Sequence, residues 1–287
     1  MVDLKKHSLY KDMEVDSVLS NVFNIYFKKF VILFMYSFVA VFIIQLIFYQ
    51  LGFWELYKVS FSDPEEILSV YSKLMGKIAI VSVSSIVVYG FLNAFLVNYL
   101  IKNDIEPSLS AGEIFIESVK KHAIHMIFFL ILSTLILIAG MFIGIIVLII
   151  GSLIAMIYLG TVLIPGGTII VAENKNAIEA IGRTFTLTHK DFWSVLGSLV
   201  LFVLIMLLVS IVLGAIMAIP FVIMFIDNWG EVGNFTELFN TKFYDIGIWS
   251  VVLNSVVSAV TYPLYAAISV VLYFKLIYVE NKNLPQE

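Results

Sequence analysis

Residues 173–195 read ENKNAIEAIGRTFTLTHKDFWSV, and their pattern is that of a short two-faced helix leading into an apolar one. As a helix, this stretch places Ile178, Ile181 and Phe185 on one face, at spacings of three and four residues. The other face carries Glu179 and Arg183, whose spacing of four predicts an ion pair. A long apolar run follows. The pattern therefore indicates a helix at a membrane surface, followed by a helix that enters the bilayer.

The ends of this helix carry start and stop signals. Asn176 is a good N-cap, and Glu179 three positions later could close a capping box. His189 and Lys190 fall near the negative C-terminal end, where positive charge is stabilising. The same arrangement, an amphipathic helix with basic residues at its C-terminus followed by an apolar span, is predicted at 13–27 and at 111–121. Their signals are Lys28 and Lys29 at the first C-terminus, Ser110 and Glu113 as a second capping box, a Glu117–Lys121 pair, and Lys120 and Lys121 at the second C-terminus.

Composition places the chain in the membrane. Of its 287 residues, 61% are hydrophobic and 13% charged, whereas charged residues make up about 25% of soluble domains. The mean hydropathy is +1.02. The absence of cysteine excludes disulfides, iron–sulfur clusters and thiolate zinc sites. A net charge of -4 argues against nucleic-acid binding, and the first apolar span is too long and too late for a cleaved signal peptide.

The spacing of apolar segments predicts six spans in an all-α polytopic membrane protein. The uncharged stretch 123–172 would be roughly 75 Å long as one helix, against a hydrocarbon core of ~30 Å, so it must be a hairpin. Gly140, Gly144 and Gly151 mark its turn region; Gly140 and Gly144 equally suit close helix contact. The predicted elements are a loose tail at 1–11, spans at about 30–51, 77–101, 124–146, 149–172, 193–219 and 248–279, a polar loop at 52–76 in which a short helix starts at 63–66, and three cytoplasmic amphipathic interfacial helices at 13–27, 111–121 and 177–189, one before each of three hairpins.

Basic residues are distributed unevenly between the two predicted sides. With the N-terminus inside, the inner segments hold 13 of them: Lys5, Lys6, Lys11, Lys28, Lys29, Lys102, Lys120, Lys121, Lys175, Arg183, Lys190, Lys275 and Lys282. The outer segments hold 4, namely Lys58, Lys73, Lys77 and Lys242. Because the side richer in Lys and Arg faces the cytoplasm, we expect both termini there, with 52–76 and 226–247 outside.

The stretch AENKNAIEAIGRTFTLTHKDFWSVLG resembles the membrane domain fused to some bacterial glycerophosphodiester phosphodiesterases, and its stand-alone relatives. In that family a proline-containing span ends in glutamate, an Ala-x-x-Arg-Ser/Thr helix follows, and a basic-x-Phe-Trp sequence enters the next span. The matching residues here are Pro165, Glu173, Ala180, Arg183, Thr184, Lys190, Phe192 and Trp193, and in the last span Pro263, Leu272, Tyr273 and Glu280, with a less typical Lys275 as the basic residue. The resemblance implies a prokaryotic plasma-membrane protein. It implies no catalytic residues, since the chemistry of fused members belongs to a separate soluble barrel.

Histidines and intramembrane amides are the candidate chemical groups. His122 and His125, three apart, could be metal ligands on one helix face; the alternative, which we favour, is polar side chains at headgroup level. Amides within the spans could line a substrate path or could hydrogen-bond between helices; they are Gln45, Asn93, Asn98 and Asn254. No charged residue falls near the middle of a span, which argues against an ion- or proton-coupled transporter.

Three prolines and seven surface residues complete the candidate sites. Pro165, Pro220 and Pro263 are expected to kink their spans or to expose carbonyls to a substrate. The candidate contacts to anionic lipid headgroups or to a membrane-protein partner are Lys28, Lys29, Lys120, Lys121, Glu173, Arg183 and Lys190, with a structural ion pair as the alternative for Glu173 and Arg183. We expect a non-enzymatic membrane protein without cofactor that organises or accommodates lipid or a protein partner. The alternatives are a transporter for a small or amphiphilic solute and, third, a lipid enzyme.

Overall fold

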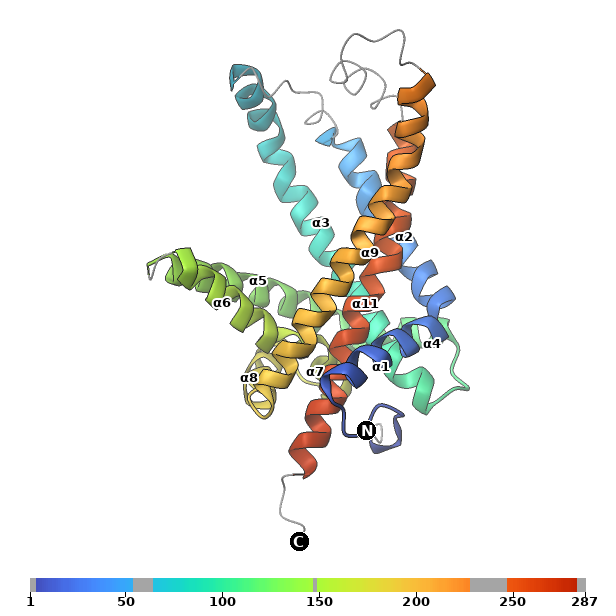
Figure 1. The fold of residues 1–287 in the computed structure, drawn as a ribbon, viewed down its shortest axis with the longest axis vertical. Helices are drawn as coiled ribbons and strands as arrows, with labels where there is room; N and C mark the ends of the chain where they lie inside the picture. Colours follow the sequence, from blue (N-terminus) through green and yellow to red (C-terminus); the bar gives the residue numbers. More distant parts are fainter. Residues whose placement is uncertain (1–3, 54–63, 147–148, 228–246, 283–287) are drawn as a thin grey trace. The chain divides into compact units, whose positions relative to one another are not determined.

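The computed structural model describes residues 4–53, 64–146, 149–227 and 247–282, and within these ranges the chain is helical without a strand. Figure 1 shows the helices in chain order. Their bounds are η1 (Leu4–Lys6), α1 (Val15–Lys28), α2 (Phe30–Gln50), α3 (Pro64–Ile105), α4 (Ala111–Lys121), α5 (Ala123–Ile146), α6 (Ile149–Leu163), α7 (Gly166–Glu173), α8 (Ala177–Thr188), α9 (Phe192–Asp227) and α11 (Gly247–Lys282).

Six segments are long and apolar enough to cross a membrane. They are Phe30–Gln50, Tyr71–Ile105, Ala123–Ile146, Ile149–Glu173, Phe192–Ile219 and Val251–Lys282. A helix needs about 20 residues to cross a hydrocarbon core of ~30 Å, and each of the six segments is at least that long. The prediction of an all-helical chain with six candidate spans is confirmed at this level.

The chain forms two compact units, each built from separate parts of the sequence. Unit 1 comprises Met1–Phe34, Ile86–Val203 and Tyr262–Glu287, and unit 2 comprises Met35–Ser85 and Leu204–Thr261. Unit 1 contains α1, α4 and α8, the three helices that were predicted at the membrane surface and that we call the three short helices. Its core includes the fully buried side chains of Phe95, Leu96, Leu100, Ile114, Met126, Ile169, Tyr273 and Phe274. Within unit 2, Lys77 Nζ donates to the carbonyl of Leu51 at 2.7 Å.

The predicted loop at 52–76 is wrong from residue 64 onward. α3 begins at Pro64, the position of the predicted helix start, and continues without interruption to Ile105. Proline is well suited to the first helical position because its missing N–H would have no partner there. Gly76 costs only about 1 kcal/mol in a helix, which does not stop it. Hydropathy locates the apolar part of a helix and not its polar beginning. Residues 54–63 lie outside the described ranges.

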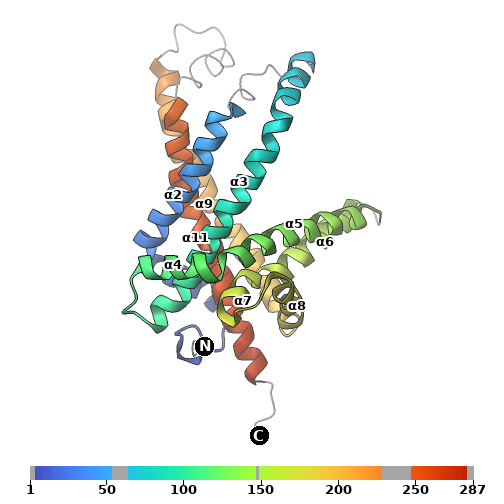
Figure 2. The same ribbon diagram turned by 180° about the vertical axis from the view of Figure 1, so that it is seen from behind.

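The predicted hairpin at 123–172 consists of α5 and α6, which lie side by side in both views (Figures 1 and 2). A Cβ at Gly140 would lie 2.3 Å from Leu159 Cδ1, and one at Gly144 would lie 2.5 Å from the Cα of Ser152. Both glycines are inside α5. Of the two roles considered for them, close helix contact is therefore the observed one. α5 ends at Ile146 and α6 begins at Ile149, and residues 147–148 lie outside the described ranges.

The predicted fourth span is divided at Pro165. α6 ends at Leu163, and α7 begins at Gly166 with Pro165 as its N-cap. Proline lacks the N–H that would continue the hydrogen-bond ladder of α6. A Cβ at Gly166 would lie 2.1 Å from Phe129 Cζ, so glycine permits the close approach of α7 to α5. By contrast, α9 and α11 continue through Pro220 and Pro263, and kinks at these two positions stay predictions.

The N-terminal segment is not a loose tail over residues 4–11, contrary to our expectation. His7 and Leu9 are buried, and the His7 ring stacks on Phe274 with centroids 4.2 Å apart. The Ser8 amide donates to Asp104 Oδ2 at 3.0 Å, and His7 Nε2 lies 3.3 Å from the carbonyl of Leu100. Two further contacts reach the last turns of α11: Asn281 Nδ2 donates to the Tyr10 hydroxyl and Lys282 Nζ to Asp12 Oδ2, each at 3.0 Å.

The three short helices occur within a residue or two of their predicted bounds, and two of their predicted caps are present. Ser110 and Glu113 form the reciprocal capping box of α4. Asn176 Oδ1 accepts from the Glu179 amide at 3.0 Å, while the described residues show no return bond from Glu179. The apolar stripe of α1 does not face outward, because Val18 and Val22 are buried in unit 1.

Candidate functional site

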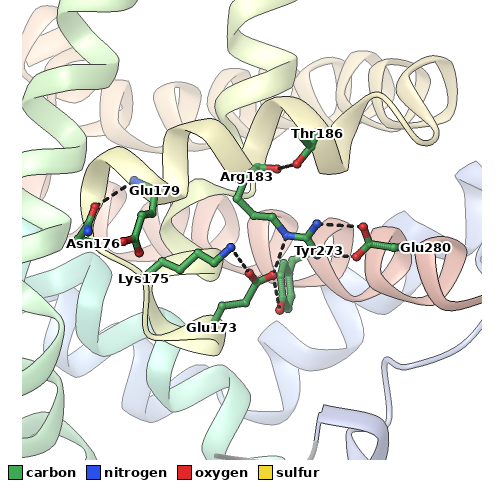
Figure 3. A network of polar contacts seen from close by, with 8 residues as sticks. All are labelled: Glu173, Lys175, Asn176, Glu179, Arg183, Thr186, Tyr273 and Glu280. Atoms are coloured by element: carbon green, nitrogen blue, oxygen red, sulfur yellow. Dashed lines mark hydrogen bonds and ion pairs between the residues drawn. The ribbon is translucent and has the colours of Figure 1, made fainter.

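Arg183 and Glu173, two of the charged residues predicted at the inner surface, belong to a cluster of polar contacts (Figure 3). The Arg183 guanidinium, from α8, donates from Nη1 to Glu280 Oε1 at 2.9 Å and from Nη2 to Glu280 Oε2 at 2.5 Å, and from Nε to Glu173 Oε1 at 3.2 Å. The Tyr273 hydroxyl also donates to Glu173, at 3.3 Å, and Lys175 Nζ lies 3.1 Å from its other oxygen. Three helices, α7, α8 and α11, are thus joined through one guanidinium.

This cluster is internally neutral, because two basic and two acidic side chains pair with one another. The bidentate hydrogen bonds that Arg183 donates to Glu280 raise the pKa of Arg183 above its usual range. The predicted Glu179–Arg183 pair is wrong: Arg183 turns toward α7 and α11, and the Glu179 side chain is exposed (Figure 3). Of the roles considered for Glu173 and Arg183, the structure shows the ion pair.

The predicted headgroup-contact lysines divide into paired and exposed side chains. Lys29 Nζ donates to the carbonyl of Leu100 at 3.3 Å and lies 5.6 Å from the Tyr99 ring centroid, and burial lowers its pKa to about 8. Lys121 pairs with Glu117 as predicted, at 2.9 Å. Within the described ranges, the exposed lysines without a hydrogen bond or ion pair to their ammonium groups include Lys28, Lys120 and Lys190.

A buried lysine near the end of α11 was not identified as a site residue. Lys275 is 2% exposed, and its ammonium lies 3.2 Å from Asp191 Oδ2 and donates to Ser194 Oγ. Asp191 immediately precedes α9, and Ser194 lies in its first turn. A buried lysine requires such pairing because an uncompensated buried charge is strongly unfavourable. The sequence signal was available, since Lys275 is the charged residue inside the apolar run of the last span.

The four intramembrane amides do not share one environment. Asn93 Nδ2 donates to the Tyr262 hydroxyl at 2.6 Å, joining α3 to α11. Asn98 Nδ2 donates to Ser118 Oγ at 3.0 Å, joining α3 to α4. Gln45 and Asn254 belong to unit 2. The two amides of unit 1 therefore act as interhelical hydrogen-bond donors, which was the alternative to a substrate path.

A polar cavity lies in unit 1, beside the C-terminal turns of α3, α4 and α7. Its volume is about 260 Å³. Its lining residues are Leu4, Asn98, Ile101, Lys102, Glu106, Glu117, Lys121, His122, Val171, Ala172 and Asn174. Asn98 is 1% and His122 4% exposed, whereas the Lys121 side chain is 63% exposed. The first two therefore form the inner end of the cavity, and Lys121 stands at its mouth.

Charges in the cavity are concentrated on one ion-paired triad. Glu117 accepts from Lys102 Nζ at 2.5 Å and from Lys121 Nζ at 2.9 Å. Burial would raise the pKa of Glu117, but the hydrogen bonds from the two lysines lower it below its usual range. Burial lowers the pKa of His122 to about 4, so this imidazole is neutral near pH 7.

His122 and His125, the two histidines considered as metal ligands, lie in different surroundings. His122, the C-cap of α4, lines the cavity, and His125 lies outside its lining. Within the described ranges, no group of three His, Cys, Asp or Glu side chains is placed to hold a metal ion. The cavity joins side chains from four segments, so the i and i+4 patterns that we used could not find it.

No protein-family model, curated protein or solved structure matches this chain. The resemblance to the membrane domain of glycerophosphodiester phosphodiesterases therefore stays a hypothesis.

Proposed function

We propose that this is a non-enzymatic, multi-pass protein of a prokaryotic plasma membrane that binds lipid at the cytoplasmic surface. The observation that supports it best concerns the three short helices. On these helices or just after them, an exposed apolar side chain lies close in sequence to an exposed lysine: Phe27 with Lys28 in α1, Ile116 with Lys120 in α4, and, beyond the end of α8, Lys190 with Trp193 of α9.

Such pairs suit the headgroup boundary. An apolar side chain exposed beside a cation can enter the acyl region while the ammonium stays among phosphates. A lysine near an anionic leaflet contributes about 1 kcal/mol to the attraction. The apolar face of α8 supports the same role, since Ile178 is exposed. For α1 the exposed anchor is Phe27 alone, because its apolar stripe packs inward.

The test is the lipid that accompanies the protein out of a mixed membrane. We expect anionic lipid to be enriched around the wild type, and the enrichment to fall several-fold when Lys28, Lys120 and Lys190 are all replaced by Gln. The matched control replaces the three lysines Lys58, Lys73 and Lys242, which are predicted outside, and should leave enrichment unchanged. Equal losses in the two triple variants would contradict the proposal.

A transporter is the alternative function. In a transporter the intramembrane amides would line a substrate path, and Asn98, one of the four, lines the cavity of unit 1. Solute uptake by proteoliposomes of the purified protein would favour transport over lipid binding.

A further inference from the structure

The inner end of the cavity in unit 1 holds a hydrogen-bond acceptor that the fold does not use. The Ser118 hydroxyl donates its single proton to the carbonyl of Ile114 at 2.7 Å, so it can only accept from Asn98. This fixes the amide orientation, with Nδ2 toward Ser118. Asn98 Oδ1 is buried and has no hydrogen-bond partner among the described residues. An unsatisfied buried acceptor costs about 1–3 kcal/mol, which a donor from a ligand would recover.

The second group at the inner end is His122. None of the described residues hydrogen-bonds its ring, and a neutral imidazole offers one N–H donor and one acceptor nitrogen. Burial keeps this ring neutral, with its pKa lowered to about 4. A position that disfavours an imidazolium disfavours an ammonium for the same reason, namely loss of hydration. Hydroxyl groups, which donate and accept without charge, match Asn98 and His122 better than an amine does.

The mouth of the cavity offers cationic donors. An ammonium group has three protons, and the observed hydrogen bonds use one from Lys102 and one from Lys121, both to Glu117. The remaining protons can bind phosphate oxygens. Glu106 at the rim is exposed and repels an anion, so the phosphate belongs on the Lys121 side.

From this arrangement we propose that the cavity binds a phosphate ester whose esterifying group carries hydroxyls, with the hydroxyls at Asn98 and His122 and the phosphate at Lys102 and Lys121. A volume of about 260 Å³ fits such a headgroup and is below the range of roughly 300–1,000 Å³ typical of sites for drug-sized molecules. The inference rests on the proposed lipid binding, and adds to it a headgroup selectivity that surface charge alone cannot provide.

The experiment compares lipids of equal acyl chains by native mass spectrometry of the purified protein. Phosphatidylglycerol carries hydroxyls beyond its phosphate, phosphatidic acid is anionic without them, and phosphatidylethanolamine is the neutral reference. We expect phosphatidylglycerol to be retained about tenfold over phosphatidic acid, as two or so hydrogen bonds would give. Lys121→Gln should reduce phosphatidylglycerol retention severalfold. Lys11→Gln, on an exposed lysine outside both the cavity lining and the proposed headgroup lysines, should not.

Asn98→Leu tests the hydroxyl contact itself: it should abolish the preference for phosphatidylglycerol and leave phosphatidic acid retention unchanged. Should this variant not fold, the comparison of Lys121→Gln with Lys11→Gln decides. Calorimetry with soluble glycerol phosphate distinguishes a free solute from a lipid. If the wild type binds glycerol phosphate and the Lys121→Gln variant does not, the cavity is a binding site and its ligand is soluble.

Two results distinguish a failure of the cavity proposal from a failure of the proposed function. Equal retention of phosphatidylglycerol and phosphatidic acid, together with no binding of glycerol phosphate, overturns the cavity proposal. If both anionic lipids still exceed phosphatidylethanolamine, the proposed surface binding stands. If neither exceeds it, the proposed function fails as well.

Discussion

Single charged residues in unit 1 hold together helices that are distant in sequence. Arg183 connects α8 to Glu280 in α11, 97 positions away. Lys275 and Asp191 connect α11 to the start of α9. These groups are mostly shielded from water, so removing one partner leaves a poorly solvated charge behind, which costs more than the pair itself contributes.

Arg183→Gln is therefore predicted to destabilise the protein by about 2–3 kcal/mol, somewhat less than the 3–5 kcal/mol of a fully buried pair, because Glu173 and Glu280 keep some exposure to water. Thermal unfolding in detergent micelles measures the loss. Lys190→Gln is the matched control, since Lys190 is exposed, and should change stability by less than about 0.5 kcal/mol. An Arg183→Gln protein that unfolds like the wild type would show that the cluster is not structural.

The burial of His122 predicts that the free energy of unfolding falls on acidification. Its folded-state pKa is lowered to about 4 by burial, and the usual value is about 6.5. Between these values the unfolded chain binds a proton that the folded chain does not, so the free energy of unfolding decreases as the pH falls through this window. His122→Gln should reduce that slope and leave the part due to His7, whose pKa burial also lowers, whereas His189→Gln, on an exposed histidine, should retain the whole slope. Unfolding curves at pH 7, 6, 5 and 4.5 compare the three proteins.

Local and long-range features of the helices differ in how well they were predicted. The Ser110–Glu113 box, the Asn176 cap and the Glu117–Lys121 pair link residues three or four apart, which a helical pattern specifies by itself. The true partners of Arg183 and the docking of His7 on Phe274 depend on which helices pack together. A periodic pattern shows which side chains share a face, and gives no information on what that face meets. The cavity was missed for the same reason.

Gly144 in α5 tests the hairpin as an element. A Cβ there would lie 2.5 Å from the Cα and 2.6 Å from the N of Ser152, and backbone atoms cannot move aside as a side chain can. Gly144→Ala is expected to separate α5 from α6 and to destabilise by about 1–3 kcal/mol. Gly160→Ala, where no atom lies within 4 Å of the new Cβ, is the control and should be neutral or stabilising. Melting temperatures in micelles that are lowered equally by both substitutions would contradict the close packing.

For the whole molecule, the side of the membrane on which each loop lies is a prediction from the basic residues counted above. Prokaryotic plasma membrane, inner termini and lipid binding belong to our proposal. The absence of cysteine makes the topology easy to measure, because any introduced thiol is the sole target for labelling.

A cysteine at Lys120 is predicted to react with an impermeant maleimide only after the membrane is opened, and one at Ser62 before it. Ser62 lies outside the described residues. Ser118, in α4 like Lys120, is fully buried, so a cysteine there would stay unlabelled from either side and would carry no topological information. Labelling of the Lys120→Cys protein in intact cells would reverse the proposed orientation.

The docking of the N-terminal segment on α11 has a consequence for synthesis. Tyr10 and Asn281 are 271 positions apart, so the segment around Tyr10 waits for α11 to be synthesised. At about 5–20 residues per second, that wait is roughly 15–50 s. During it, His7 can already contact Leu100 in α3, but the His7 ring lacks Phe274 and the Tyr10 hydroxyl lacks Asn281. A chain that lacks α11 would keep the contacts of the N-terminal segment with α3 and lose those with α11, so we expect an added protease to cut this segment sooner than in the chain that contains α11.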